Sequence, residues 1–103
     1  SMKQIVADAH RLQAERYSGL PLGFNSELSG QLLKRFCAIP REAASLLRQS
    51  FELLGLSARA YDRILKIART IADLEGKEAI ETQHIAEAIH YRILDRDQRA
   101  NPA

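Results

Sequence analysis

One arginine occupies an unusual position for chemistry, at the start of the longest predicted helix. Ser57 is a good helix cap, because its hydroxyl can accept a hydrogen bond from a first-turn backbone N–H. Arg59 then lies in the first turn, where the helix dipole disfavours a cation by about 0.3–1 kcal/mol. A helix N-terminus with free N–H groups beside a guanidinium is, however, a good site for an anion. From the residues alone, a solvent-exposed surface arginine is the simpler interpretation.

The other polar residues do not form a recognisable catalytic or metal-binding motif. The sequence contains no GxxxxGK(S/T), GxGxxG, HExxH or CxxC pattern. We interpret His10, His84 and His90 as surface histidines, because their spacing does not suit a shared metal ion. Most carboxylates have a basic neighbour three or four residues away, which is typical of solvent-exposed pairs on helices. Two such pairs are Asp62 with Lys66 and Arg69 with Asp73. We therefore expect no catalytic residue, no metal site and no independent enzyme activity in this chain.

Length and composition are those of one small globular domain. The chain has 103 residues, of which 46% are hydrophobic and 27% are charged. Its net charge of +2 is too small to indicate a nucleic-acid partner by itself. The single cysteine, Cys37, excludes a disulfide framework, and we expect it to be a small buried hydrophobe on a helix.

The limits of the domain and its compartment also follow from sequence features. No apolar run reaches the roughly 18 residues of a membrane span, and no signal peptide is visible. We therefore expect a cytoplasmic protein without membrane partners. Ser1 and Met2 are typical of a cloning scar. We assign residues 3–96 to a folded domain cut from a longer chain, and residues 97–103 to a polar tail.

Five segments have the apolar period of amphipathic helices, and none has the pattern of a strand. The predicted helices cover residues 3–17, 26–38, 40–54 and 57–76, followed by a last helix capped by Thr82. Asn25 or Ser26 is the predicted cap of the second helix. Gly55 and Gly76 are the predicted stops of the third and fourth, and residues from Asp95 onward should fray. The short connections predict an all-α fold, a small bundle of about four to five helices.

The predicted core consists of one apolar stripe on each helix. The stripe of the fourth helix is wide enough for more than one neighbour to pack against it. The first helix is only modestly apolar, at Ile5, Val6, Ala9 and Leu12, so we expect it to belong partly to a neighbour outside the chain. The remaining predicted core residues are Leu28, Leu32, Leu33, Phe36, Ala43, Leu46, Leu47, Phe51, Leu53, Leu54, Ala60, Tyr61, Ile64, Leu65, Ile67, Ala68, Ile71, Ala72, Leu74, Ile85, Ala88, Ile89 and Ile93.

Two stretches of the sequence resemble one protein family. The resemblance is carried by LSARAYDRILKIARTIADL, residues 56–74, and by HIAEAIHYR, residues 84–92. Both are similar to the C-terminal domain of magnesium-chelatase-related AAA+ ATPases, the YifB/ComM-like proteins of bacteria. Gln13 and Arg16 fit the end of the first helix in this family, whereas Arg11 stands one position later than the family pattern expects. The resemblance covers nearly all of the chain after Met2.

This resemblance implies a function that the residues alone do not show. The chain would be the helical lid of an AAA+ ATPase whose Walker motifs lie in an upstream core domain. Arg59 matches the sensor 2 arginine, which reaches the γ-phosphate of ATP in the same subunit or across a subunit interface. Arg63 would lie near the nucleotide edge or an interface, and Gln13 and Arg16 would face the nucleotide or the next subunit.

The resemblance also implies cofactors and partners for the full-length protein. ATP and Mg²⁺ would bind only in the full-length protein, and we expect no cofactor in this chain alone. The implied partners are the upstream AAA+ core and the neighbouring subunits of a hexameric ring. DNA is a candidate substrate of the ComM-like machine.

Two other functions stay open when the residues are considered alone. A helical nucleic-acid-binding module would lay a basic stripe on phosphates, although Asp62 and Asp73 interrupt that stripe. A protein-interaction adaptor would use the apolar loop of residues 20–24. The basic stripe would consist of Arg59, Arg63, Lys66 and Arg69.

Overall fold

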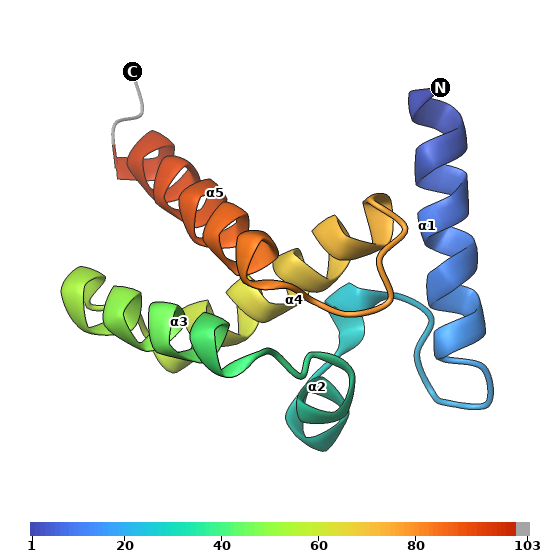
Figure 1. Cartoon of the computed structure of the whole chain (residues 1–103), viewed down its shortest axis with the longest axis horizontal. Helices are drawn as coiled ribbons and strands as arrows, with labels where there is room; N and C mark the ends of the chain where they lie inside the picture. The colour runs from blue at the N-terminus through green and yellow to red at the C-terminus, as the bar shows by residue number, and fades with distance from the viewer. Residues whose placement is uncertain (101–103) are drawn as a thin grey trace.

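The computed structural model of the chain is an assembly of helices joined by short connections (Figure 1). It describes the backbone of residues 1–100 and the side chains of residues 1–93. No residue in the described range forms a strand, which confirms the all-α class. None of the helices there is long and apolar enough to cross a membrane. The elements are α1 (Met2–Arg16), the short 3-10 helix η1 (Asn25–Glu27), α2 (Gly30–Phe36), α3 (Arg41–Leu54), α4 (Ala58–Leu74) and α5 (Thr82–Ala100).

The two chain ends bear on the predicted domain limits. Ser1, assigned to a cloning scar, caps α1 by accepting a hydrogen bond from the N–H of Gln4 at 3.3 Å. Residues 97–103, the predicted polar tail, and the fraying expected from Asp95 lie where side chains, or whole residues, are outside the described structure. The predicted limits of the domain therefore stay a prediction.

α4 is the central helix of the fold. It contacts α1, η1 and α5, and α5 also packs against α3 (Figure 1). This arrangement confirms the prediction that several neighbours share the wide apolar side of this helix. The apolar side chains that α4 buries are those of Ala60, Ile64, Leu65, Ala68 and Ala72.

Both predicted ends of α4 are confirmed. The hydroxyl of Ser57 accepts a hydrogen bond from the N–H of Ala60 at 3.2 Å. At the other end Gly76 has a φ of +72°, a left-handed conformation that favours glycine. This conformation lets the N–H of Lys77 donate to the carbonyl of Ala72 at 2.8 Å, as in a Schellman motif. Local sequence signals therefore determine the length of α4.

The second helix is shorter than predicted and starts later. Residues 25–27 form the separate helix η1, and α2 begins at Gly30, whose φ is +53°. The predicted cap at Asn25 or Ser26 is wrong, because the side chain of Asn25 is bound to other elements of the fold. Leu28 lies between η1 and α2 and is fully buried. This segment is thus held by core contacts rather than by one continuous helix.

Two further expectations are wrong. Leu53 does not widen the apolar stripe of α3, because it is 85% exposed. Thr82 is the first residue of α5 rather than its cap, since the N–H of His84 donates to the carbonyl of Glu81 at 3.0 Å. The loop of residues 20–24 packs against the core through Leu20 and Leu22, whereas its Phe24 is an exposed large hydrophobe.

The burial of Cys37 at the C-terminal end of α2 generates a first prediction. The residue is 3% exposed, and burial raises the pKa of its thiol to about 11. The thiolate is the reactive form of cysteine. At pH 8 an ordinary thiol, with a pKa near 8.5, is much more ionised than the thiol of Cys37. We predict that maleimide labels Cys37 at least about 100-fold more slowly in the folded protein than in urea. Mass spectrometry of timed samples measures both rates, and similar rates would contradict the buried position.

Candidate functional site

Arg59 is exposed in the first turn of α4. Within the part of the chain that the structure describes, its guanidinium makes no hydrogen bond and no ion pair. The cap at Ser57 uses the N–H of Ala60, so the N–H groups of Ala58 and Arg59 lack partners inside the helix. The first turn of α4 therefore presents unpaired donors and a positive charge to solvent.

Arg63 lies one turn further along the same side of α4 and is also exposed. It lines an open groove of about 750 Å³ between α4 and α5, together with Lys66 and Tyr91. The ammonium group of Lys66 already has one partner there, because its Nζ donates to the backbone carbonyl of Ser26 at 3.2 Å. The exposed cations of α4 thus run from its first turn into this groove.

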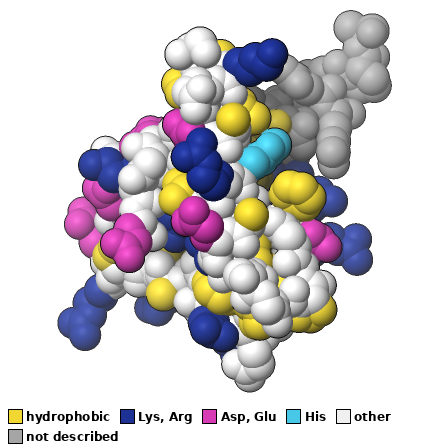
Figure 2. Space-filling model, turned by 90° about the vertical axis from the view of Figure 1, so that its right-hand side faces the viewer, with side chains coloured by type: hydrophobic (Ala, Val, Ile, Leu, Met, Phe, Trp, Pro, Cys, Tyr) yellow, Lys and Arg dark blue, Asp and Glu magenta, His cyan; other side chains and the backbone are white. Residues whose placement is uncertain are grey.

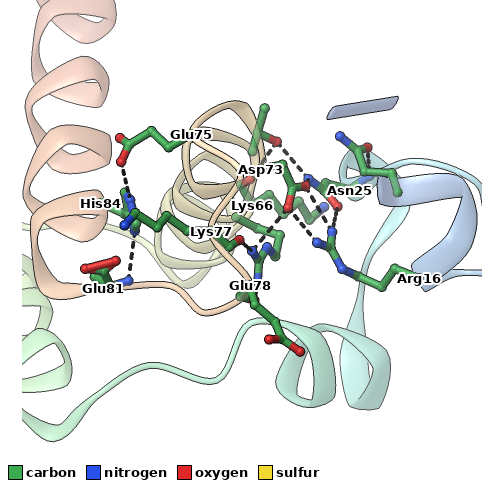
Figure 3. A network of polar contacts seen from close by, with 12 residues as sticks. Arg16, Asn25, Lys66, Asp73, Glu75, Lys77, Glu78, Glu81 and His84 are labelled. Atoms are coloured by element: carbon green, nitrogen blue, oxygen red, sulfur yellow. Dashed lines mark hydrogen bonds and ion pairs between the residues drawn. The ribbon is translucent and has the colours of Figure 1, made fainter. Parts of the chain in front are cut away.

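A buried carboxylate joins α1, η1 and α4 at the opposite end of α4 (Figure 3). Asp73 is 2% exposed. Its Oδ1 accepts a hydrogen bond from Nη2 of Arg16 at 2.5 Å and forms an ion pair with Nη2 of Arg69 at 3.1 Å. Its Oδ2 accepts from Nη1 of Arg16 and from Nδ2 of Asn25, each at 2.9 Å. The prediction that Arg69 and Asp73 form a solvent-exposed pair is therefore wrong.

Asn25 is the second centre of this network. It is 2% exposed, and its Nδ2 also donates to Oγ1 of Thr70 at 3.0 Å. Its Oδ1 accepts hydrogen bonds from the guanidinium of Arg16 and the hydroxyl of Tyr17. Its backbone N–H donates to Oε1 of Gln13 at 3.0 Å. These bonds satisfy the polar side chain of Asn25 and explain why it does not cap α2.

Arg69 extends the network to the connection between α4 and α5. Its side chain is buried, and its two terminal nitrogens donate to the backbone carbonyls of Glu78 and Lys77 at 3.0 Å each. Arg69 therefore holds residues 77 and 78 against α4. This position removes Arg69 from the basic stripe that a nucleic-acid-binding module would need.

The environment of the network shifts two pKa values upward. The hydrogen bonds from Arg16 to the Asp73 carboxylate raise the pKa of the guanidinium. Burial raises the pKa of the Tyr17 hydroxyl. Arg16 therefore stays charged and Tyr17 stays neutral at any ordinary pH, so neither group titrates out of the network.

His84 is fully buried at the start of α5, so its interpretation as a surface histidine is wrong. Its Nδ1 accepts a hydrogen bond from the N–H of Glu81 at 2.8 Å. In the neutral ring the proton is therefore on Nε2, which lies 3.1 Å from Oε1 of Glu75 (Figure 3). His84 thus joins the last turn of α4 to the first turn of α5. In the described residues no group of three or more His, Cys, Asp or Glu could hold a metal ion.

The four predicted site residues fall into two groups. Arg59 and Arg63 are exposed on α4, whereas Gln13 and Arg16 have internal hydrogen bonds to Asn25 and Asp73. A role of any of them toward a nucleotide or another subunit stays a prediction. The sequence reading missed Asn25 and Asp73, and the only sequence signal for Asp73 was its i, i+4 spacing from Arg69.

The burial of Asp73 generates a second prediction. Asp73→Asn removes the charge that compensates two arginines, and leaving a buried charge unpaired typically costs about 3–5 kcal/mol. We predict a loss of that size in the free energy of unfolding, measured by urea denaturation followed by circular dichroism. Asp62→Asn is the matched control, because Asp62 is an exposed carboxylate on the same helix. Equal effects of the two substitutions would contradict a stabilising role for the network.

Comparison with known proteins places these features in a family. The sequence model described as "Magnesium chelatase, subunit ChlI C-terminal" matches residues 1–92. The uncharacterized protein YifB of Salmonella typhimurium is 40% identical over 96 residues, and the competence protein ComM of Haemophilus influenzae is 38% identical over 95 residues. These matches cover 93% and 92% of this chain, respectively. No solved structure matches the chain.

The relatives are much longer than this chain. The match covers only 18% of YifB and 18% of ComM, so an upstream domain is implied. The predicted resemblance is therefore confirmed at the level of the family. The chain belongs to the family of magnesium chelatase C-terminal domains, in the form found in the larger YifB/ComM-like proteins of bacteria.

Proposed function

We propose that this domain is the helical lid of an AAA+ ATPase and that Arg59 is its sensor 2 arginine. In this proposal Arg59 contacts the γ-phosphate of ATP bound by the upstream core. One observation carries the proposal: Arg59 is exposed in the first turn of α4 and has no partner among the described residues. Membership of the magnesium chelatase family supports the same assignment.

Arg59 differs from the arginines that are bound inside the domain. Arg16 and Arg69 each bind the carboxylate of Asp73 and stabilise the fold. Arg59 has no such contact, and its position near the positive end of the helix dipole is mildly unfavourable. A phosphate placed at this turn would be attracted by the guanidinium and by the free backbone N–H groups together. An anionic ligand thus provides a physical reason for a cation at this position.

The proposed mechanism couples the phosphate to lid movement. A charge-assisted contact between Arg59 and the γ-phosphate exists only while that phosphate is present. Hydrolysis removes the contact and frees the lid to rotate relative to the core. Because ATP favours only the closed arrangement, the cycle shifts the population between two lid positions.

The full-length protein would supply the remaining parts. We propose that its upstream core binds ATP and Mg²⁺ and that neighbouring subunits form a ring, with the lid contributing to their contacts. One relative is named competence protein ComM, and we propose DNA processing for the full-length protein by analogy with it. This chain alone would bind ATP weakly and would not hydrolyse it, because a single arginine cannot replace a phosphate-binding loop.

The sensor assignment predicts a selective loss of ATP hydrolysis. We expect Arg59→Ala in the full-length protein to lower kcat about ten- to hundredfold, since a hydrogen bond to a charged group contributes about 1.5–3 kcal/mol. Steady-state phosphate release measures kcat, and size-exclusion chromatography checks that assembly is intact. Arg48→Ala is the matched control, because Arg48 is an exposed arginine on α3. Arg69 would be a poor control, because it is buried.

A second measurement separates this role from a structural one. In this chain alone Arg59→Ala should leave the free energy of unfolding unchanged or raise it by up to about 1 kcal/mol. The substitution removes a positive charge from the positive end of the helix dipole. Normal hydrolysis by the Arg59→Ala protein with intact assembly would refute the sensor assignment. A large loss of stability in the isolated chain would instead assign Arg59 to the fold.

A further inference from the structure

The apolar side of α1 continues beyond the part that packs on the rest of the domain. Ala9 and Gln13 are the buried residues of this helix. Met2, Ile5 and Val6 lie on the same side one and two turns earlier, yet they are 75%, 43% and 39% exposed. In Figure 1 the N-terminal half of α1 extends past the end of α4. Ile5 and Val6, the two of these residues that lie inside the predicted domain, are called the α1 overhang below.

The surroundings of the α1 overhang extend this apolar surface. His10 lies one turn after Val6, and the ring of Phe24 packs edge-on against it with the ring centroids 5.8 Å apart. Phe24 is itself 52% exposed. Figure 2 looks onto the side of the molecule where α1 lies and shows hydrophobic side chains exposed there among charged ones. Single exposed hydrophobic residues are normal on a surface, whereas a stripe that continues a buried one indicates an interaction site.

The opposite side of α1 is polar. Asp8 accepts hydrogen bonds from Nε2 of Gln4 at 2.9 Å and from Nη2 of Arg11 at 2.7 Å, and all three side chains face solvent. The N-terminal half of α1 is therefore amphipathic, and on its apolar side Ile5 and Val6 stay 43% and 39% exposed. This pattern is typical of a helix that packs against a partner on one side only.

We propose that the α1 overhang docks against the part of the same polypeptide that precedes α1. The relatives are about five times longer than the match, and the matched family is a C-terminal one, so most of the full-length chain precedes this helix. That part is covalently joined to the N-terminal end of α1. A short tether raises the effective concentration of a partner to the millimolar range, which favours a contact within one chain.

This docking would position the lid on the core. Arg16, at the other end of α1, binds Asp73 of α4 through two hydrogen bonds. A contact made at Ile5 and Val6 would therefore be transmitted to α4 through a buried ion pair. The inference does not depend on whether Arg59 contacts ATP, so the two proposals can fail separately.

Cysteine labelling tests the inference directly. Ile5→Cys is introduced into the full-length protein and into the 103-residue chain, and maleimide labelling of that position is followed by peptide mass spectrometry. We expect labelling to be at least about tenfold slower in the full-length protein, because the thiol must wait for the docked surfaces to open. Leu53→Cys is the control on α3, because Leu53 is 85% exposed. Its labelling rate should be the same in both chains.

Three outcomes are informative. Slower labelling of Ile5→Cys at every protein concentration, including that of the dilute monomer, supports docking within one chain. Equal rates in the two chains would overturn the proposal. Protection that appears only when subunits assemble would also overturn it, because a neighbouring subunit would then cover the α1 overhang. Val6→Cys provides a second position if Ile5→Cys does not fold, and slow labelling of Cys37 confirms that each protein is folded.

Discussion

The carboxylate of Asp73 determines how α1, η1 and α4 are arranged. A buried charge is tolerated only when donors of opposite charge and further hydrogen bonds compensate it. Asp73 receives these from Arg16 of α1, Asn25 of η1 and Arg69 of α4 itself. Arg69 also binds the backbone that leads into α5. Three elements far apart in the sequence therefore meet at one side chain, and moving any of them would leave a buried charge unpaired.

The two ends of α4 use arginine in opposite ways. Near the C-terminal end, Arg69 and Arg16 are bound to Asp73 and belong to the fold. At the N-terminal end, Arg59 is exposed and has no partner in the described part of the chain. Arg59 and Asp73 are about 21 Å apart along the helix, since a helix rises 1.5 Å per residue. A rigid helix fixed at one end can carry a displacement from a ligand at the other, as the proposed nucleotide-sensing role would require.

The two halves of α1 also differ in how they contact the rest of the domain. Its C-terminal half is held by Gln13 and Arg16 in the buried network, whereas its N-terminal half carries the exposed apolar residues Ile5 and Val6. One half of this helix is therefore packed on the domain, while the other half exposes apolar side chains. This agrees with a domain that spans less than a fifth of the length of its relatives YifB and ComM.

The sequence by itself determined the all-α class, the limits of α3 and α4, the family and the exposed position of Arg59. These features depend on signals from adjacent residues, such as the cap at Ser57 and the glycines that end α3 and α4. The tertiary structure alone decided which polar residues are buried. Arg16 and Asp73 are 57 residues apart, and Asn25 and Thr70 are 45 apart. A polar side chain enters the interior only where distant partners satisfy it, so no local pattern could distinguish Asp73, Asn25 or His84 from residues exposed to solvent.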